Sequence, residues 1–217
     1  MTPQLIGLGA GGHAKVVLEA LLAIGGAEVR GLLDPCPALH GQQILGVPVL
    51  GDDSLLGQLK EQGVTGFFMG VGSVGDARLR RRLFAWALGL GFDAITVIHP
   101  RAVVSPSVVV GRGTCIFAGA VVNAAACLGE NVIVNTGAVV EHDCQLGDHV
   151  HVATGACLGG GVMVGSGSHI GLGACVREGI RIGRDALVGA GAVVVEDVQD
   201  EVVVVGVPAR YLRAVAR

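Results

Sequence analysis

The chain has 217 residues and a formal net charge of −3, with 51% hydrophobic and 15% charged residues. This length suits one large domain or two smaller ones, and the charge provides no basic surface for nucleic acid. No apolar run approaches the length of a membrane span, and the N-terminus lacks the basic region and cleavage site of a secretory signal. We therefore expect a cytoplasmic protein with no membrane span and no nucleic-acid partner.

The 37 glycines and an aromatic share of only 3% favour close backbone stacking around small aliphatic side chains. The six cysteines include no CxxC pair and no Cys/His cluster with zinc-ligand spacing, so we expect reduced, packed thiols and no bound metal. They are Cys36, Cys115, Cys127, Cys144, Cys157 and Cys175.

The first third of the chain resembles half of a dinucleotide-binding fold. An apolar run at 4–8 leads into the glycine-rich stretch Gly7–His13, a helical pattern follows at 16–22, and a second apolar run at 29–33 ends in Asp34. A helix N-terminus with free N–H groups suits a phosphate. A glycine-rich turn alone can be a purely structural strand-to-helix connection, but the acid at the end of the second strand favours a nucleotide site.

The same region continues with a strand at 67–71 that runs into Gly72, a helix at 76–88 and a strand at 95–98 before His99-Pro100. Proline disfavours helix at the preceding residue, which makes this dipeptide a natural boundary. The arginines of the helix (Arg78, Arg80, Arg81 and Arg82) are expected to form a solvated face. Because a segment of this size leaves room for one mononucleotide only, residues 1–98 are predicted to form a Rossmann-like domain for a nucleotide substrate rather than NAD.

The rest of the chain is a hexapeptide repeat. From Val104 to Val194 every sixth residue is Val, Ile or Leu, sixteen positions in succession. The residue two places before is mostly small, and glycine commonly follows. Three hexads make one triangular coil, and coils stack at roughly 4.8 Å like strands in a sheet. Residues 99–217 are therefore predicted to form a parallel β-helix with a C-terminal tail; known proteins with this repeat wind left-handed.

One outer face of this β-helix is wholly apolar. The residue before each aliphatic position points outward, and on this face the residues are Val103, Val121, Val139, Cys157, Cys175 and Val193. A continuous apolar stripe rarely faces water, so we expect it to pack on a neighbouring subunit.

Polar residues interrupt the repeat in its middle coils. His142 is flanked by Glu141 and Asp143, and a carboxylate can orient an imidazole and stabilise its protonated form, as a general base requires. Gly160 lies three hexads further and should occupy the same position one coil along, where an accessible backbone N–H could hold an oxyanion. By the same spacing, His151 and His169 should stack. A carbonic anhydrase of the β-helix type would need three histidines that converge across a subunit interface, and His142, His151 and His169 do not include the close pair that such sites use.

These residues give the chain a resemblance to the sialic acid O-acetyltransferase family of sugar acyltransferases. The best-matching members N-acetylate nucleotide-linked 4-amino sugars such as UDP-bacillosamine precursors and GDP-perosamine. The matching motifs are Gly9-Ala10-Gly11-Gly12-His13, Asp34, Ile98-His99-Pro100, Asn135-Thr136, Glu141-His142-Asp143-Cys144 and Gly206-Val207-Pro208-Ala209-Arg210.

The resemblance implies a homotrimer with active sites between adjacent β-helices. In it His142 is the general base, Asp143 its carboxylate partner, and Asn135 a polar residue of the same pocket. The implied contacts with acetyl-CoA come from His151, Gly160, Leu172 and Ala190. The implied contacts with the nucleotide sugar come from Gly11, Gly12, His13, Asp34 and Gly72.

The predicted activity is acetyl-CoA-dependent N-acetylation of a nucleotide-linked amino sugar in glycan or surface-polysaccharide biosynthesis, by direct transfer. Cys144 and Cys157 are interpreted as packed thiols rather than as acyl carriers. The alternative is O-acetylation of a sugar hydroxyl, such as that of sialic acid, which uses the same base and donor; only the nucleotide-binding domain argues against it. A non-catalytic β-helical scaffold would need neither the acid-flanked histidine nor that domain.

Overall fold

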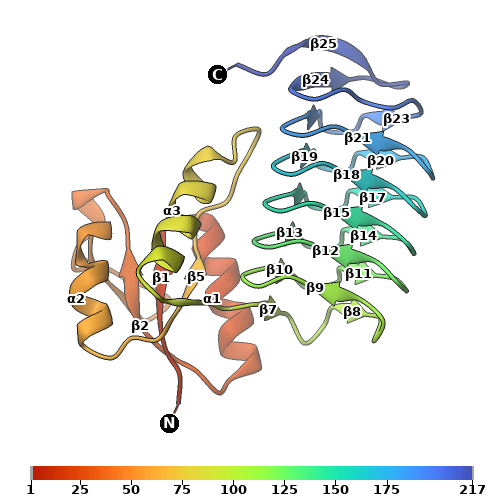
Figure 1. Cartoon of the computed structure of the whole chain (residues 1–217). Helices are drawn as coiled ribbons and strands as arrows, with labels where there is room; N and C mark the ends of the chain where they lie inside the picture. Colours follow the sequence, from red (N-terminus) through yellow and green to blue (C-terminus); the bar gives the residue numbers. More distant parts are fainter. Residues whose placement is uncertain (1, 217) are drawn as a thin grey trace. The chain divides into compact units, whose positions relative to one another are not determined.

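The computed structural model describes residues 2–216, which form two compact units (Figure 1). One unit comprises the chain through Gly72 together with Arg78–His99. The other comprises the chain from Pro100 together with Ser73–Ala77, a short segment that interrupts the first unit in sequence. Each unit has its own apolar core and is described separately.

The first unit is an α/β fold around a six-stranded sheet with the order β3-β4-β2-β1-β5-β6. Only β3 runs antiparallel to its neighbour. The elements are β1 (Gln4–Leu8), α1 (Gly12–Ile24), β2 (Glu28–Leu33), β3 (Gln43–Ile44), β4 (Val47–Gly51), α2 (Leu56–Glu61), β5 (Gly66–Met69), α3 (Arg78–Gly89), β6 (Asp93–Ala94) and β7 (Val97–Ile98), with two 3₁₀ turns at Pro37–Leu39 and Asp53–Leu55. The parallel strands have the order of a Rossmann half, and the predicted fold class is confirmed.

Several details of this unit differ from the sequence-based expectation. The segment 95–98 contains only part of a strand of this sheet, because the pairing with β5 uses Asp93–Ala94 and β7 belongs to the eight-stranded sheet. The β3–β4 hairpin and α2 were not predicted. The arginine run of α3 is not uniformly solvated: Arg82 is exposed, whereas Arg80 is fully buried.

The second unit is a left-handed parallel β-helix built from short strands in three sheets. Sheet I contains β10 (Cys115–Ile116), β13 (Ile133–Val134), β16 (His151–Val152), β19 (His169–Ile170) and β22 (Leu187–Val188). Sheet II contains β8 (Val103–Val104), β11 (Val121–Val122), β14 (Val139–Val140), β17 (Cys157–Leu158), β20 (Cys175–Val176) and β23 (Val193–Val194). Sheet III contains β9 (Val109–Val110), β12 (Cys127–Leu128), β15 (Gln145–Leu146), β18 (Met163–Val164) and β21 (Arg181–Ile182).

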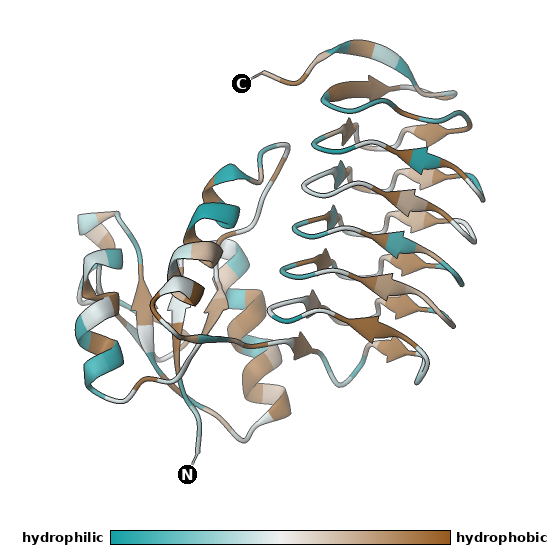
Figure 2. Ribbon diagram, viewed as in Figure 1, coloured by the Kyte–Doolittle hydropathy of each residue, from teal (hydrophilic) through white to brown (hydrophobic). Residues whose placement is uncertain are grey.

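Register in all three sheets follows the predicted step of three hexads, as in the pairs Ile133 with His151 and Val139 with Cys157. The second residue of each strand points inward. Fourteen of the sixteen aliphatic positions are at most 4% exposed, and the other two, Val104 and Val110, lie in the first coil and pack against the core. In Figure 2 the strands of the β-helix are mostly brown, as expected for an interior filled by aliphatic side chains.

The C-terminal end of the β-helix departs from the repeat. The last coil is shorter than the others, because Leu187 pairs with Val203 rather than with Val205, and Ile182 pairs with Val198 rather than with Asp200. The strand β24 (Val202–Val205) continues sheet I, and β25 (Arg210–Ala214) then pairs with β24 in the antiparallel sense. The predicted tail is therefore an ordered hairpin that ends the sheet.

Three interior positions next to the turns hold a side chain that bridges coils. Ser168 Oγ donates to Gly183 O at 2.6 Å and accepts from Ala186 N–H at 2.9 Å. Thr114 makes the same pair of bonds, to Gly129 O and to Val132 N–H. Cys144 Sγ donates to Gly159 O at 3.2 Å. The side chains thus form hydrogen bonds with backbone N–H or C=O groups of the next coil. Alanine, the common residue at these positions, cannot form them.

The Ser168→Ala variant should lower the free energy of unfolding by about 1–3 kcal/mol, since it removes the two hydrogen bonds through which this buried side chain joins successive coils. Urea denaturation followed by circular dichroism would measure this loss. Ser107→Ala is the matched control, because Ser107 Oγ also accepts a backbone N–H from the next coil but is exposed, so water can replace it. Equal stability of wild type and Ser168→Ala would contradict the bridging role.

Candidate active site

The turn between β14 and β15 places a histidine beside its carboxylate partner. Asp143 Oδ2 accepts a hydrogen bond from His142 Nδ1–H at 2.7 Å, and the two side chains are 63% and 66% exposed. Asp143 has a φ of +60°, a left-handed conformation that Asp tolerates, and its N–H donates to Ala124 O in the preceding coil. The register between coils therefore fixes the backbone of this pair.

The electrostatics of the turn favour a basic imidazole. The hydrogen bond to Asp143 raises the pKa of His142 above its ordinary value, partial desolvation opposes this, and the charges of Asp143 and Glu141 add to the rise. Because Nδ1 donates its proton to Asp143, Nε2 of the neutral ring has a free lone pair. An imidazole in this state can remove a proton from a substrate.

Gly160 lies directly beside the His142 ring, one coil along. A Cβ atom on Gly160 would come within 2.7 Å of Cε1 and Nε2 of that ring. The equivalent positions one coil before His142 and one coil after Gly160 hold Ala124 and Glu178, so the backbone at this corner accepts a side chain. Within residues 2–216 the Gly160 N–H has no hydrogen-bond acceptor. The glycine is therefore required by the imidazole, and it leaves a free N–H donor beside it.

The nearby thiols have no features of a nucleophile. Cys144 is fully buried and its Sγ donates to Gly159 O. Burial raises the pKa of the Cys144 thiol, and burial together with the neighbouring Cys175 raises the pKa of Cys157. A raised pKa lowers the thiolate fraction, which argues against an acyl-enzyme on either residue.

A second polar group lies on sheet I and on the turn that follows it. His151 Nδ1 is 2.5 Å from Ser73 O, and His151 Nε2 is 3.2 Å from Asn135 Nδ2. His151 is only 5% exposed. Its ring contacts that of His169 edge to face, with centroids 4.8 Å apart, so the predicted stacking of these histidines is present.

Leu172 and Ala190 lie on the same corner as Asn135, between sheets I and II, and both are exposed. His142 and Gly160 lie on the next corner, between sheets II and III. The predicted residues of the β-helix thus lie in two groups, one at each edge of sheet II.

The nucleotide-site candidates of the first unit surround the β1–α1 turn. Gly11 is the N-cap of α1, Gly12 is its first residue, and space is open around both, so the helix N-terminus is accessible. Both oxygens of the Asp34 carboxylate accept backbone N–H groups, Oδ2 from Ala10 at 2.9 Å and Oδ1 from Cys36 at 3.0 Å. Asp34 therefore holds the glycine-rich turn against the end of β2.

His13 and Gly72 pack together on the other side of this turn. A Cβ on Gly72 would lie 3.4 Å from His13 Cγ. Burial and the charge of Arg80 lower the pKa of His13 to about 4, so the ring is neutral at pH 7. Sequence reasoning missed Arg80, because nothing in a run of four nearby arginines indicates which one turns inward.

Other features of the chain are distinct from these groups. A shallow groove along the outer face of sheet III is lined by residues such as Cys127, Gln145, Met163 and Arg181, and by none of the predicted site residues. Among residues 2–216, no three His, Cys, Asp or Glu side chains gather closely enough to hold a metal ion. In the same residues, no helix has the length and apolarity needed to cross a bilayer.

The sequence matches a family model and a characterised enzyme. Residues 4–87 match the family model of the PglD N-terminal domain. A segment of 113 residues is 39% identical to UDP-N-acetylbacillosamine N-acetyltransferase of Bacillus subtilis, and this segment spans about half of each protein (51% of this chain, 50% of the relative).

Solved structures match the chain over nearly its whole length. PerB from Caulobacter crescentus, in complex with CoA and GDP-perosamine, is 46% identical with a TM-score of 0.90, and the match covers 98% of both chains. The acetyltransferase domain of PglB from Neisseria gonorrhoeae, in complex with acetyl coenzyme A, is 40% identical with a TM-score of 0.90, covering 98% of this chain and all of that one. The chain therefore belongs to the hexapeptide-repeat N-acetyltransferases of amino sugars.

Proposed function

We propose that the chain transfers the acetyl group of acetyl-CoA to the amine of a nucleotide-linked amino sugar, by direct transfer within a ternary complex. The observation that supports this most is the His142–Asp143 pair beside the free N–H of Gly160. The PerB structure contains GDP-perosamine, a nucleotide-linked amino sugar, and CoA, which is what remains of the proposed donor after transfer. A cytoplasmic location stays a prediction from the sequence.

In this mechanism the amine nitrogen attacks the thioester carbonyl as His142 Nε2 takes the amine proton. The Gly160 N–H donates to the oxyanion that forms on the carbonyl oxygen. Collapse of the tetrahedral intermediate breaks the carbon–sulfur bond, and the proton held by His142 neutralises the departing thiolate. Asp143 keeps the ring oriented and stabilises its protonated form. Asn135 is proposed as a further polar contact in the same pocket.

The nucleotide part of the acceptor is proposed to bind at the β1–α1 turn. Its phosphates would accept from the N–H groups at Gly11 and Gly12, where the helix dipole favours negative charge. His13, neutral at pH 7, would contribute a hydrogen-bond donor rather than a charge. Asp34 would use its remaining lone pairs for the acceptor, and the absence of a side chain at Gly72 leaves room beside His13.

Acetyl-CoA is proposed to contact His151, Leu172 and Ala190, on or beside the corner between sheets I and II. Leu172 and Ala190 are exposed and available for this role. For His151 both ring nitrogens have protein partners, so contact with the coenzyme would use another part of the ring.

A homotrimer would bring the two corners together. Within one chain, the whole of sheet II lies between the corner of His142 and the corner of Leu172. If the apolar outer faces of sheet II meet around a threefold axis, the corner between sheets II and III of one subunit meets the corner between sheets I and II of the next. Sedimentation of a monomer alone at micromolar concentration would contradict this arrangement.

The activity is tested by incubating the protein with acetyl-CoA and a panel of UDP-, GDP- and dTDP-linked amino sugars while thiol release is followed. We expect CoA release that depends on one of these sugars, and mass spectrometry should locate the acetyl group on nitrogen. The His142→Ala variant should lose at least ~10²-fold in turnover with that substrate, because general-base catalysis is removed.

Two further variants control this experiment. Gly160→Ala should lose activity with its fold intact, since the added methyl group would displace the His142 ring at a corner where alanine is otherwise accepted. His149→Gln, which changes another histidine of the β-helix turns, should keep normal turnover. Release of CoA with hydroxyl sugars alone, or near-normal turnover of His142→Ala, would refute the assignment.

The rate should depend on pH through His142. The base must be unprotonated, so kcat/KM should fall as the pH drops through the raised pKa of this group. Asp143→Asn removes the first cause of the rise, and the acid limb of the profile should therefore shift to lower pH while the plateau falls. A pH profile of kcat/KM for both proteins measures this; an unchanged acid limb in Asp143→Asn would show that another group controls it.

A further inference from the structure

His151 occupies an outward position on sheet I and is nevertheless buried. Its neighbour is the segment Ser73–Ala77, which belongs to the β-helix unit although the chain on both sides belongs to the α/β unit. Ser73 is itself only 6% exposed. A main-chain carbonyl from this segment is thus buried against an imidazole of the β-helix that is far away in sequence.

The partners of the ring determine its tautomer. Ser73 O is a carbonyl oxygen and can only accept, so Nδ1 of His151 must bear the hydrogen in the 2.5 Å contact. In the neutral ring Nε2 is then an acceptor. The atom 3.2 Å away is the amide nitrogen of Asn135, which is a donor. Both contacts are satisfied only by the Nδ1–H tautomer.

The same network fixes the orientation of the Asn135 amide. Its Oδ1 accepts from Thr136 N–H at 2.8 Å, and its Nδ2 donates to His151. Exchanging the oxygen and nitrogen of this amide would place two acceptors, or two donors, against each other at both contacts. Asn135 therefore presents a single orientation, and His151 is one of the two groups that set it.

A second contact holds the segment in place. Gly75 has a φ of +74°, and a Cβ at this position would lie 2.7 Å from Cδ1 of Leu187, on the same sheet as His151. The segment is thus closely packed on sheet I at two points, one polar and one apolar.

We propose that His151 is a positioning residue: its Nδ1–H fastens the segment Ser73–Ala77 to sheet I, and its Nε2 orients the amide of Asn135. This role rests on the proposed function, in which Gly72, the residue directly before the segment, contacts the nucleotide sugar and Asn135 lines the acetyl-transfer pocket. His151 thereby contacts both the segment that follows Gly72 in the chain and the amide of Asn135.

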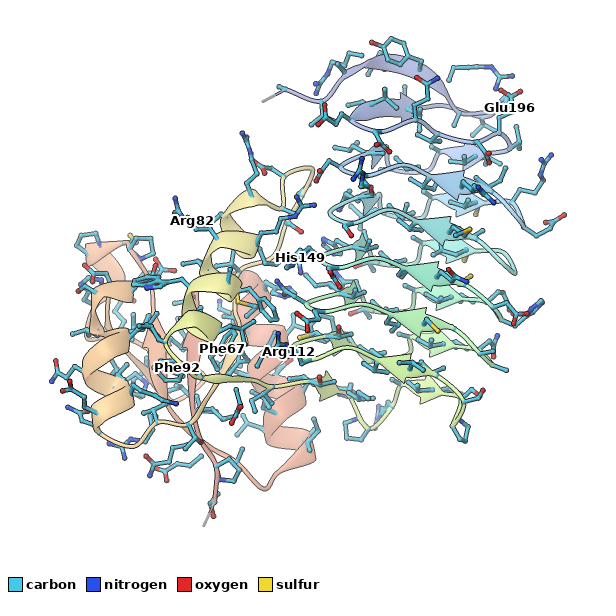
Figure 3. All side chains as sticks on the ribbon, viewed as in Figure 1. Phe67, Arg82, Phe92, Arg112, His149 and Glu196 are labelled. Carbon is cyan, nitrogen blue, oxygen red and sulfur yellow. The ribbon has the colours of Figure 1, made fainter. Side chains whose placement is uncertain are left out.

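The attachment of the segment Ser73–Ala77 to sheet I is tested by limited trypsin digestion of the full-length protein. Mass spectrometry measures the rate of cleavage after Arg78. In His151→Gln the side-chain amide lies near the position of Nε2, so no donor remains for Ser73 O. Because the segment is then held less firmly, cleavage should accelerate about tenfold. His151→Asn keeps an N–H near the position of Nδ1 and should retain slow cleavage. The matched control is His149→Gln, because His149, labelled in Figure 3, is also paired with an asparagine amide, that of Asn131 at 3.0 Å.

A variant that leaves His151 in place gives an independent test. Gly75→Ala introduces a clash with Leu187 and a strained φ, so it should release the segment and accelerate the same cleavage. Carbon and nitrogen chemical shifts of selectively labelled histidine should identify His151 as the Nδ1–H tautomer in the wild type. An Nε2–H tautomer, or unchanged cleavage in both His151→Gln and Gly75→Ala, would overturn the proposal.

Kinetics separate this role from a purely structural one. His151→Gln should raise the KM for the nucleotide amino sugar about tenfold and the KM for acetyl-CoA clearly less, since the segment adjoins the acceptor site whereas the proposed coenzyme contact uses only the part of the ring that is not hydrogen-bonded. An equal rise in both KM values would overturn the link to the acceptor. If the wild type acetylates no amino sugar, the proposed function fails, whereas the digestion and the chemical shifts still decide whether His151 fastens the segment.

Discussion

Backbone pairing between successive coils of equal length is the constraint on which the β-helix depends. Each short strand pairs with the strand one coil before and one coil after, so a residue's neighbours above and below are set by its number alone. Because side chains alternate inward and outward, the same pairing also fixes which side of the wall each residue faces. A slip of one position would turn the aliphatic ladder outward and bring the outward-facing residues, including Gln145 and Arg181, into the interior.

The proposed chemistry uses this rigidity directly. His142 and Gly160 lie on different coils. The stacking of these coils places the imidazole against the backbone of Gly160, so no additional loop is needed to bring them together. Thr114 and Ser168 use the same stacking, because the hydroxyl group of each side chain accepts a hydrogen bond from a backbone N–H of the next coil. In the proposed mechanism, residues at the turns of the β-helix therefore supply the reacting groups, while aliphatic side chains fill its interior.

Much of this architecture could be predicted from the sequence, because the features concerned are periodic. The ladder from Val104 to Val194 predicted the β-helix, and the step of three hexads placed His142 beside Gly160 and His151 beside His169. The glycine-rich turn and Asp34 likewise predicted the Rossmann-like half.

The features that sequence reasoning missed are short or depend on tertiary contacts. The strand β3 and the helix α2 are too short for a period to be recognised. The burial of Arg80 depends on the packing of α3 rather than on its local pattern. No periodicity connects Ser73 to a histidine so far along the chain, so the docking of that segment, and the tautomer it imposes, became visible only in three dimensions.

The hairpin at the C-terminus has a consequence for assembly. A stack of parallel strands has two open ends, and each could in principle accept another stack, coil upon coil, into a growing filament. In sheet I, β25 reverses the strand direction at the last position, and its residues are exposed, with arginines at Arg210 and Arg213. The final edge of sheet I therefore offers an antiparallel strand to a second molecule, which does not continue the parallel stack at this end.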